Sequence, residues 1–121
     1  MTRKLLYLAG PYSADPTVCT RVALITATAI YERTEFVPVV PHLSHLWHLV
    51  TPMSYEDWLT IDLAILERCH AITRLPGESA GADREVARAL QLELPMIEFS
   101  TFSQAVLHAY EGAARGLLVG R

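Results

Sequence analysis

The sequence predicts a Rossmann-like α/β fold, a three-layer sandwich with a small parallel sheet of about four to five strands. Short apolar runs that end at glycine or proline alternate about four times with segments of helical spacing. Successive β-α-β units form parallel sheets through right-handed crossovers, which place helices on both faces. Because 51% of the 121 residues are hydrophobic, the chain can build one core, and we expect a single domain over residues 1–121.

The first strand and the first helix have clear sequence boundaries. Residues 4–9 form a short apolar run that stops at Gly10-Pro11, as a buried strand does. Asp15 before Pro16 matches a helix start, with an N-cap acceptor and a proline at the first helical position. The helix is expected to end near Arg33. Its apolar stripe, at spacings of four, three and four, comprises Val18, Val22, Ile25 and Ala29.

The other elements continue this alternation. Residues 36–40 are β-branched and predict the second strand, whereas residues 42–53 fit either a helical turn or a loop. Ser54 with Asp57 resembles a capping box and opens a helix to about Arg68. We expect a strand at 70–75, a helix at 82–92, a strand at 95–99 and a helix at 103–113. The tail from Ala114 is expected to be loose unless a partner subunit covers it.

Composition excludes several classes of protein. The formal net charge of −3 provides no basic surface for nucleic acid or for an anionic membrane. The apolar run near the N-terminus, about five residues long, is too short for a signal peptide or a membrane span. Cys19 and Cys69 lie 50 positions apart, without the spacing of a zinc site or a disulfide scaffold. We therefore expect a soluble cytoplasmic protein that binds neither nucleic acid nor membrane.

Three loops of unusual composition are expected to share one edge of the sheet. They follow the first three strands, at residues 10–13, 41–42 and 76–81. Ligands of open α/β sheets bind beyond the carboxyl ends of the strands. Gly10 permits a close backbone approach, and Ser79 with Gly81 before a helix N-terminus can hold an anion. Ordinary strand–helix turns use the same residue types, so the loops alone do not define a site.

Two carboxylates are expected to face inward from different helices. Glu85 lies in the first turn of its helix, where the helix dipole favours a negative charge. Asp62 falls within an apolar stripe, and a buried charge is costly unless it is paired or used. The stripes of the two helices comprise Ala82, Val86, Ala89 and Leu90, and Trp58, Leu59, Ile65, Leu66 and Cys69. Singly, each acid also fits a structural role; together they resemble the paired acids of glycosidic-bond cleavage.

The sequence predicts no metal and no other cofactor. His42, His45 and His48 recur every three residues, but on a helix this spacing rotates successive side chains by about 60°. Only two of them would therefore reach one ion, and we expect hydrogen-bonded or solvated histidines near a pocket rim. Trp47, Trp58 and Tyr55 are interpreted as packing residues, although one of them could line a base-binding wall.

Four segments, in this order and spacing, carry a resemblance to a known family. They are Tyr7-Leu8-Ala9-Gly10-Pro11-Tyr12-Ser13, Pro41-His42, Asp62-x-x-x-Leu66-x-x-Cys69 and Leu75-Pro76-Gly77-Glu78-Ser79-x-Gly81-x-x-x-Glu85-x-x-x-Ala89. From about residue 5 to residue 99 the chain resembles the nucleoside 2-deoxyribosyltransferase-like superfamily, and within it a small branch related to nucleoside 5′-monophosphate N-glycosidases. The resemblance implies a flavodoxin-like sheet and cleavage of an N-glycosidic bond.

The resemblance also implies roles for the matching residues. By position, Glu85 corresponds to the glutamate that attacks the anomeric carbon of the sugar. Asp62 corresponds to the aspartate that positions the sugar and helps to protonate the leaving base. Tyr7 and Gly10 correspond to the strand end that lines the sugar pocket. Ser79 corresponds to a serine that holds a 5′-phosphate, which favours a nucleoside 5′-monophosphate as substrate.

Further positions complete the expected site. Pro11, Tyr12, His42 and Gly81 are expected to contact the substrate, and Arg21 is expected as a second phosphate contact. The chain departs from the family pattern in three places. Cys69-His70 stands where relatives commonly have Cys-Asp, the segment at 75–78 lacks a tryptophan, and residues 10–15 replace an arginine-rich glycine loop.

We therefore expect an enzyme that cleaves the N-glycosidic bond of a (deoxy)nucleoside 5′-monophosphate through Glu85. The products would be free base and sugar phosphate, or a new nucleotide if the sugar is transferred to another base. The alternatives are a non-catalytic nucleotide sensor and a glycohydrolase of nicotinamide-type dinucleotides. Because members of the family are usually homo-oligomers, a dimer or larger assembly is also expected, with residues 104–118 as the candidate contact.

Overall fold

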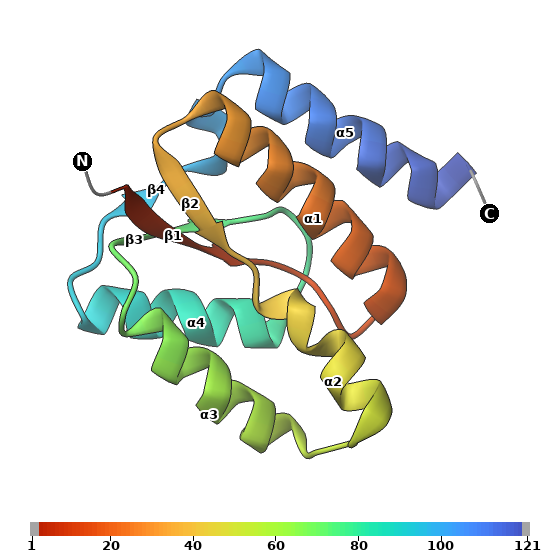
Figure 1. Cartoon of the computed structure of the whole chain (residues 1–121), viewed down its shortest axis with the longest axis vertical. Helices are drawn as coiled ribbons and strands as arrows, with labels where there is room; N and C mark the ends of the chain where they lie inside the picture. Colours follow the sequence, from red (N-terminus) through yellow and green to blue (C-terminus); the bar gives the residue numbers. More distant parts are fainter. Residues whose placement is uncertain (1–2, 120–121) are drawn as a thin grey trace.

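The structure, a computed structural model, describes residues 3–119 of the chain and the side chains of residues 3–115 (Figure 1). Strands and helices alternate along the chain, as the sequence predicts. In chain order the elements are β1 (Lys4–Ala9), α1 (Pro16–Arg33), β2 (Phe36–Val39), the 3₁₀ turn η1 (Pro41–Leu43), α2 (Ser44–Val50), α3 (Tyr55–Leu66), β3 (Ala71–Arg74), α4 (Ala80–Gln91), β4 (Met96–Ile97), the 3₁₀ turn η2 (Phe99–Thr101) and α5 (Gln104–Val119).

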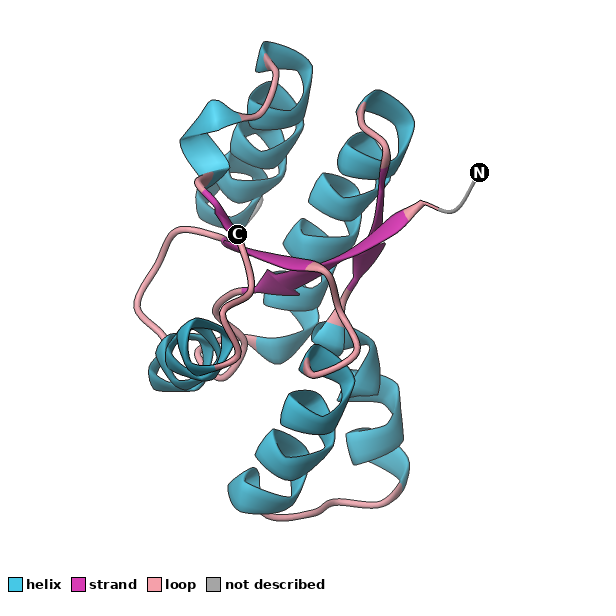
Figure 2. Cartoon of the chain, turned by 90° about the vertical axis from the view of Figure 1, so that its left-hand side faces the viewer, coloured by secondary structure: helices cyan, strands magenta, loops and turns pink. Residues whose placement is uncertain are grey.

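The strands of the described chain form one parallel sheet in the order β2-β1-β3-β4. In β1, Leu6 pairs with Pro38 of β2 on one side and with Ala71 of β3 on the other. The chain therefore leaves β1 in one direction across the sheet and later returns to its other side. Figure 2 shows the sheet between two layers of helices, which confirms the predicted α/β class.

Side chains of β1 alternate between two cores, one on each face of the sheet. Leu6 and Leu8 pack in the core beneath α1 and α5, and Tyr7 and Ala9 pack in the core beneath α3 and α4. Phe99, Phe102 and Val106 close the first core, and Leu66, Ile72, Ala82 and Ala89 close the second. Because β1 is buried on both faces, its sequence reads as a continuous apolar run.

Hydrogen-bonding side chains fix where two of the helices start. The Asp15 side chain accepts a hydrogen bond from the Val18 backbone N–H at 3.3 Å, at the N-terminus of α1. The Ser54 hydroxyl accepts one from the Asp57 N–H at 3.1 Å, at the N-terminus of α3. Both caps satisfy backbone donors that a helix cannot pair internally, and both were predicted.

Several sequence-based expectations need correction. The chain from Ala114 is not loose, because α5 continues as a helix to Val119, although side chains after residue 115 lie outside the described set. Leu90 and Ile65 are 65% and 42% exposed, since each lies at the margin of its helix stripe. In α1 the buried stripe is centred one position away from the predicted one. It comprises Val22, Ala23, Thr26, Ala27 and Ile30, so that Val18, Ile25 and Ala29 are half-buried.

Candidate active site

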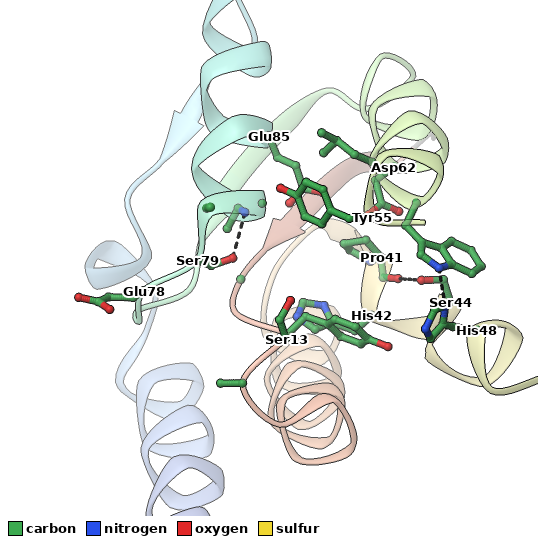
Figure 3. A pocket seen from close by; sticks show the side chains of 18 of the residues that line it. Ser13, Pro41, His42, Ser44, His48, Tyr55, Asp62, Glu78, Ser79 and Glu85 are labelled. Carbon is green, nitrogen blue, oxygen red and sulfur yellow. Dashed lines mark hydrogen bonds between the residues drawn. The ribbon is translucent and has the colours of Figure 1, made fainter. Parts of the chain in front are cut away.

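A cleft of about 590 Å³ opens at the carboxyl edge of the sheet, where β1 and β3 end (Figure 3). Its walls come from the loop after β1 and from α2, α3 and α4. The strand that follows β1 in the chain, β2, lies on one side of it, and the next strand, β3, lies on its other side. The strand order therefore reverses direction at β1, and open α/β sheets bind ligands at such a point. The volume falls within the roughly 300–1,000 Å³ that small-molecule sites occupy.

The cleft gathers most of the residues that the sequence singles out. Its lining includes seven of them, namely Gly10, Tyr12, His42, Asp62, Ser79, Gly81 and Glu85. Tyr7 lies directly behind the lining, fully buried, and touches the cleft through its hydrogen bond to Glu85. Pro11 lines a separate small hollow instead, and Arg21 is exposed on α1 and lines neither space. The structure thus separates Arg21 from the residues with which it was expected to act.

Glu85 is a buried carboxyl group, 5% exposed. It lies in the second turn of α4 and not in the first as predicted, because the helix begins at Ala80, two residues before the predicted start. The Ser79 hydroxyl caps this helix by accepting a hydrogen bond from the Ala82 N–H at 3.1 Å. Glu85 shares the inward face of α4 with Ala82 and Ala89, as the helical spacing predicts. The Tyr7 hydroxyl donates a hydrogen bond to Glu85 Oε2, which holds one oxygen of the carboxyl group in place.

Burial changes the acid–base properties of Glu85. It raises the pKa of Glu85 to about 7, and the charge of Asp62 acts in the same direction. The Tyr7 hydrogen bond and the positive charge of Arg74 lower the pKa of Glu85 and oppose part of that rise. Glu85 is therefore a more basic carboxylate than an exposed one, and a better nucleophile or base when ionised.

Asp62 faces the same cleft from another helix, α3. Burial raises the pKa of Asp62 to about 7, so near neutral pH a substantial share of the molecules carry a proton on this group. The pKa of Tyr7 is also raised well above its usual range, first by burial and then by the charges of Glu85 and Asp62. Tyr7 therefore remains a hydrogen-bond donor at neutral pH.

Aromatic side chains form the outer walls of the cleft. Tyr55 and Trp58 line it from α3, and Tyr12 lines it from the loop after β1. The Trp58 indole N–H donates a hydrogen bond to His48 Nδ1 at 2.6 Å, and Trp47 packs edge-on against Trp58 with ring centroids 5.0 Å apart. From the sequence, these rings could either pack only within the protein or also form a wall for a planar ligand. Tyr55 and Trp58 line the cleft, which fits the second interpretation.

The loop between β3 and α4 is held by Arg74, a residue that the sequence analysis missed. Its guanidinium donates hydrogen bonds to the carbonyl oxygens of Leu75 and Gly77, the latter at 2.8 Å, and to Asp83 Oδ1 at 3.1 Å. Gly77 has a φ of 115°, and a Cβ there would lie 2.7 Å from Pro11 Cγ, so only glycine fits. The sequence contains one signal for this role, namely an arginine at the end of a strand, two residues before Pro76-Gly77.

The cleft lining is acidic. No lysine or arginine lines it among the residues that the structure describes, whereas Asp62, Glu78 and Glu85 do. An anionic group of a ligand would therefore depend on the N-terminus of α4, where the backbone N–H groups of Ala80 and Gly81 begin the helix.

Each of the three spaced histidines has its own partners. His42, 3% exposed, bonds the Pro11 carbonyl oxygen through Nε2 at 3.0 Å, and burial lowers the pKa of His42. His45 Nδ1 lies 2.8 Å from the Tyr12 hydroxyl, and His48 Nδ1 accepts a hydrogen bond from Trp58. Hydrogen-bonded histidines were predicted. Across residues 3–119, no group of three potential ligands could hold a metal ion.

One departure from the family pattern lies away from the cleft. His70 precedes β3, at the amino end of that strand, and its Nδ1 accepts a hydrogen bond from the Leu5 backbone N–H at 2.9 Å. The histidine therefore extends the pairing of β1 with β3 at the edge opposite the cleft.

No helix within the described residues has the length and hydropathy to cross a membrane.

Comparisons with known proteins give a relationship at the level of structure. No protein-family model matches the chain, and no curated protein matches it either. Among solved structures the chain is similar to a 2-desoxiribosyltransferase from Leishmania mexicana, with a TM-score of 0.60 and 18% sequence identity. The alignment covers 79% of this chain and 63% of that chain, so this chain spans less than two thirds of its length. At this identity the likeness concerns the fold.

Proposed function

We propose that the chain is an enzyme that cleaves the N-glycosidic bond of a (deoxy)nucleoside 5′-monophosphate, with Glu85 as nucleophile and Asp62 as general acid. The observation that carries the proposal is the pair of carboxyl groups, from two helices, that line one cleft with pKa values near 7. Two further observations support it: the family-like order of the sequence motifs and a fold similar to that of a protein named for 2-deoxyribosyl transfer.

In the first half-reaction, a carboxylate oxygen of Glu85 attacks C1′ of the sugar. The bond between C1′ and the base nitrogen breaks, its electron pair goes to the base, and the proton of Asp62 goes to that base. Because Tyr7 donates its hydrogen bond to Oε2, Oε1 is the oxygen assigned to the attack. The product is a glycosyl ester on Glu85, as in retaining glycosidases.

In the second half-reaction, water attacks C1′ and the ester bond to Glu85 breaks. Asp62, now ionised, accepts the proton of this water, so both acids return to their starting states. If a second base occupies the cleft in place of water, its nitrogen attacks C1′, the ester bond to Glu85 breaks, and Asp62 accepts the proton that this nitrogen loses, so the sugar is transferred. Hydrolysis and transfer share the first half-reaction, and access of water to the ester decides between them.

The two ends of the substrate are assigned from the lining of the cleft. The base stacks against the wall that contains Tyr55 and Trp58, because planar rings pack well on aromatic side chains. The 5′-phosphate lies at the N-terminus of α4, beside Ser79 and Gly81, where the helix dipole favours an anion. Since no cationic side chain of the described lining assists, the phosphate should contribute modestly to affinity, and the unphosphorylated nucleoside should also react.

Base release tests the proposal directly. The protein is incubated with ribo- and deoxyribonucleosides, their 5′-monophosphates and a nicotinamide dinucleotide, with and without an acceptor base, and free base is followed by chromatography. We expect release by the wild type and a loss of at least about 10³-fold in Glu85→Gln. Glu32→Gln, an exposed glutamate on α1 away from the cleft, is the matched control and should retain activity.

Three outcomes have distinct meanings. A new nucleoside or nucleotide in the presence of the acceptor base would assign a transferase. Release only from the dinucleotide would move the substrate to that class and would contradict the monophosphate assignment. If no substrate loses its base while a nucleotide raises the melting temperature, the enzyme proposal is overturned in favour of a sensor.

A further inference from the structure

Helix α2 exposes its apolar side chains and turns its polar side chains toward the protein. Ser44, His45 and His48 are half-buried and bond to groups of the same fold, including Tyr12 and Trp58. The large apolar side chains of this segment are between 52% and 77% exposed. They are Leu43, Leu46, Trp47, Leu49 and Val50, defined here as the α2 apolar face.

The spacing of this face is that of a helix packed against a partner. Leu43, Leu46, Trp47 and Val50 follow at three, four and seven positions from the first, which places them on one side of the turn and helix. In a surface helix of a single globular unit, such a stripe faces the core. Here it faces outward, on the side of α2 away from the cleft. The stripe is therefore available for contact with a surface outside the described fold.

The absence of charge narrows the kind of partner. Residues 36–55 contain no aspartate, glutamate, lysine or arginine, so the segment that carries the α2 apolar face has no formal charge at pH 7 apart from its histidines. Attachment to an anionic membrane depends on basic residues around the apolar side chains, and this segment has none. A second copy of the chain fits well, because two uncharged faces meet without repulsion although each chain carries a net charge of −3.

The area is also sufficient for self-association. Five side chains exposed to this extent present on the order of 100 Å² each, so pairing would bury about 1,000 Å² over two copies before rim residues are counted. That value reaches the lower limit of a specific interface. Trp47, held edge-on against Trp58, supplies the kind of rigid aromatic anchor that is enriched at interface centres.

The C-terminal helix is a weaker candidate for the same contact. Its inward residues Val106, Leu107 and Tyr110 already pack against the core that Phe99 and Phe102 close, so that face is occupied within the chain. The sequence analysis placed the oligomer contact at residues 104–118. Side chains of residues 116–118 lie outside the described set.

We propose that the chain forms a two-fold symmetric dimer through the α2 apolar face. A two-fold axis pairs the same patch on both copies, so one short helix can cover its equivalent. Because the opposite side of α2 contributes Ser44 and His48 to the cleft lining, dimerisation fixes the outer side of a cleft wall. The inference does not depend on the proposed reaction.

Sedimentation equilibrium without any nucleotide tests the dimer, so its outcome is independent of activity. At about 100 μM the wild type should have twice the 13.5 kDa mass of the chain. Leu46→Glu and Val50→Glu should each raise the dimer dissociation constant by at least about tenfold, because they bury a charge at the interface. Leu90→Glu is the matched control: Leu90 is 65% exposed on α4, on another face, and its variant should dimerise like the wild type.

Four results would overturn the inference. A wild type that remains monomeric at that concentration excludes the dimer. A dimer that both α2 variants leave unchanged uses a different face, such as α5. Equal weakening by Leu46→Glu and Leu90→Glu indicates non-specific association. A monomer that binds vesicles through Leu46 assigns the α2 apolar face to a membrane. Circular dichroism spectra that match the wild type establish that each variant is folded.

Discussion

Helices α4 and α2 both form walls of the cleft, and they reverse the usual placement of side chains in opposite ways. In α4 a carboxyl group, Glu85, lies on the buried face among alanines. In α2 the most apolar side chains lie outside, with Leu46 at 69% exposed, and histidines lie inside. Positions where a sequence departs from binary patterning are expected at functional sites, because such departures cost stability. On the two proposals made above, the buried carboxyl group of α4 serves chemistry and the exposed apolar stripe of α2 serves association.

The largest expected effect concerns the carboxyl pair. The proposed reaction needs Glu85 ionised and Asp62 protonated, and the pKa values of both groups are about 7. The value of kcat/KM should fall below pH 7 as Glu85 gains a proton and fall above pH 7 as Asp62 loses one. Asp62→Asn should lower kcat/KM by about 10²–10⁴-fold and remove the alkaline decline, because an amide has no proton to lose.

A pH–rate profile of wild type and variant provides the measurement. Substrates whose base leaves without protonation should be much less sensitive to Asp62→Asn, which separates loss of the acid from general damage to the cleft. An alkaline decline that persists in Asp62→Asn would assign the acid to another group.

A smaller effect concerns the stability cost of Glu85. Burial raises the pKa of Glu85 from its ordinary 4.5 to about 7, so between these values the folded state holds a proton that the unfolded chain releases. Stability contributed by this group is therefore lost as the pH rises through that window. Glu85→Gln should have a free energy of unfolding about 1–3 kcal/mol greater than the wild type at pH 8 and similar to it at pH 5.

Urea unfolding of both proteins at the two pH values tests this expectation. A variant that is inactive yet more stable at pH 8 would indicate that Glu85 is retained for chemistry rather than for folding. A glutamine variant that is less stable than the wild type at pH 8 would instead favour the structural interpretation of this residue, as a glutamate that supports its helix.

The smallest effect is expected on the outer face of α2. Leu46→Glu should change the free energy of unfolding of the monomer by no more than about 0.5 kcal/mol, because Leu46 is 69% exposed and its removal leaves no cavity. Urea unfolding at a protein concentration below the dimer dissociation constant provides the measurement. A loss of more than about 2 kcal/mol in the free energy of unfolding would show that the Leu46 side chain packs within its own chain. It would contradict the difference drawn between α2 and α4.

Features set by neighbouring residues were predicted from the sequence, whereas features set by contacts between distant residues were not. The bounds of β1 and α1 were predicted because Gly10-Pro11 and Asp15-Pro16 are local signals that end a strand and start a helix. The inward position of Glu85 followed from helical periodicity within α4. The bond between Tyr7 and Glu85 could not be predicted from spacing, because it joins residues 78 apart and depends on the packing of α4 against β1.

Helix α2 shows where periodicity alone fails. Residues 42–53 carry both an apolar stripe and a row of histidines, and spacing does not say which of them faces the protein. The decision is made by partners elsewhere in the chain, since Tyr12 and Trp58 bond the histidines and draw that side inward. Ile65 and Leu90 were wrongly predicted to lie in the core. Helical periodicity locates the centre of an apolar stripe better than its margins, where both of these residues lie.

The loop tied by Arg74 has a consequence for the thermodynamics of binding. Loops that bind anions commonly lose conformational entropy when the ligand orders them, and that loss is subtracted from the affinity. Here Arg74 bonds the backbone at Leu75 and Gly77, while Pro11 packs beside Gly77. The turn before α4 is therefore ordered in the free protein. A ligand that reaches it meets a preorganised site, and its association needs no loop closure.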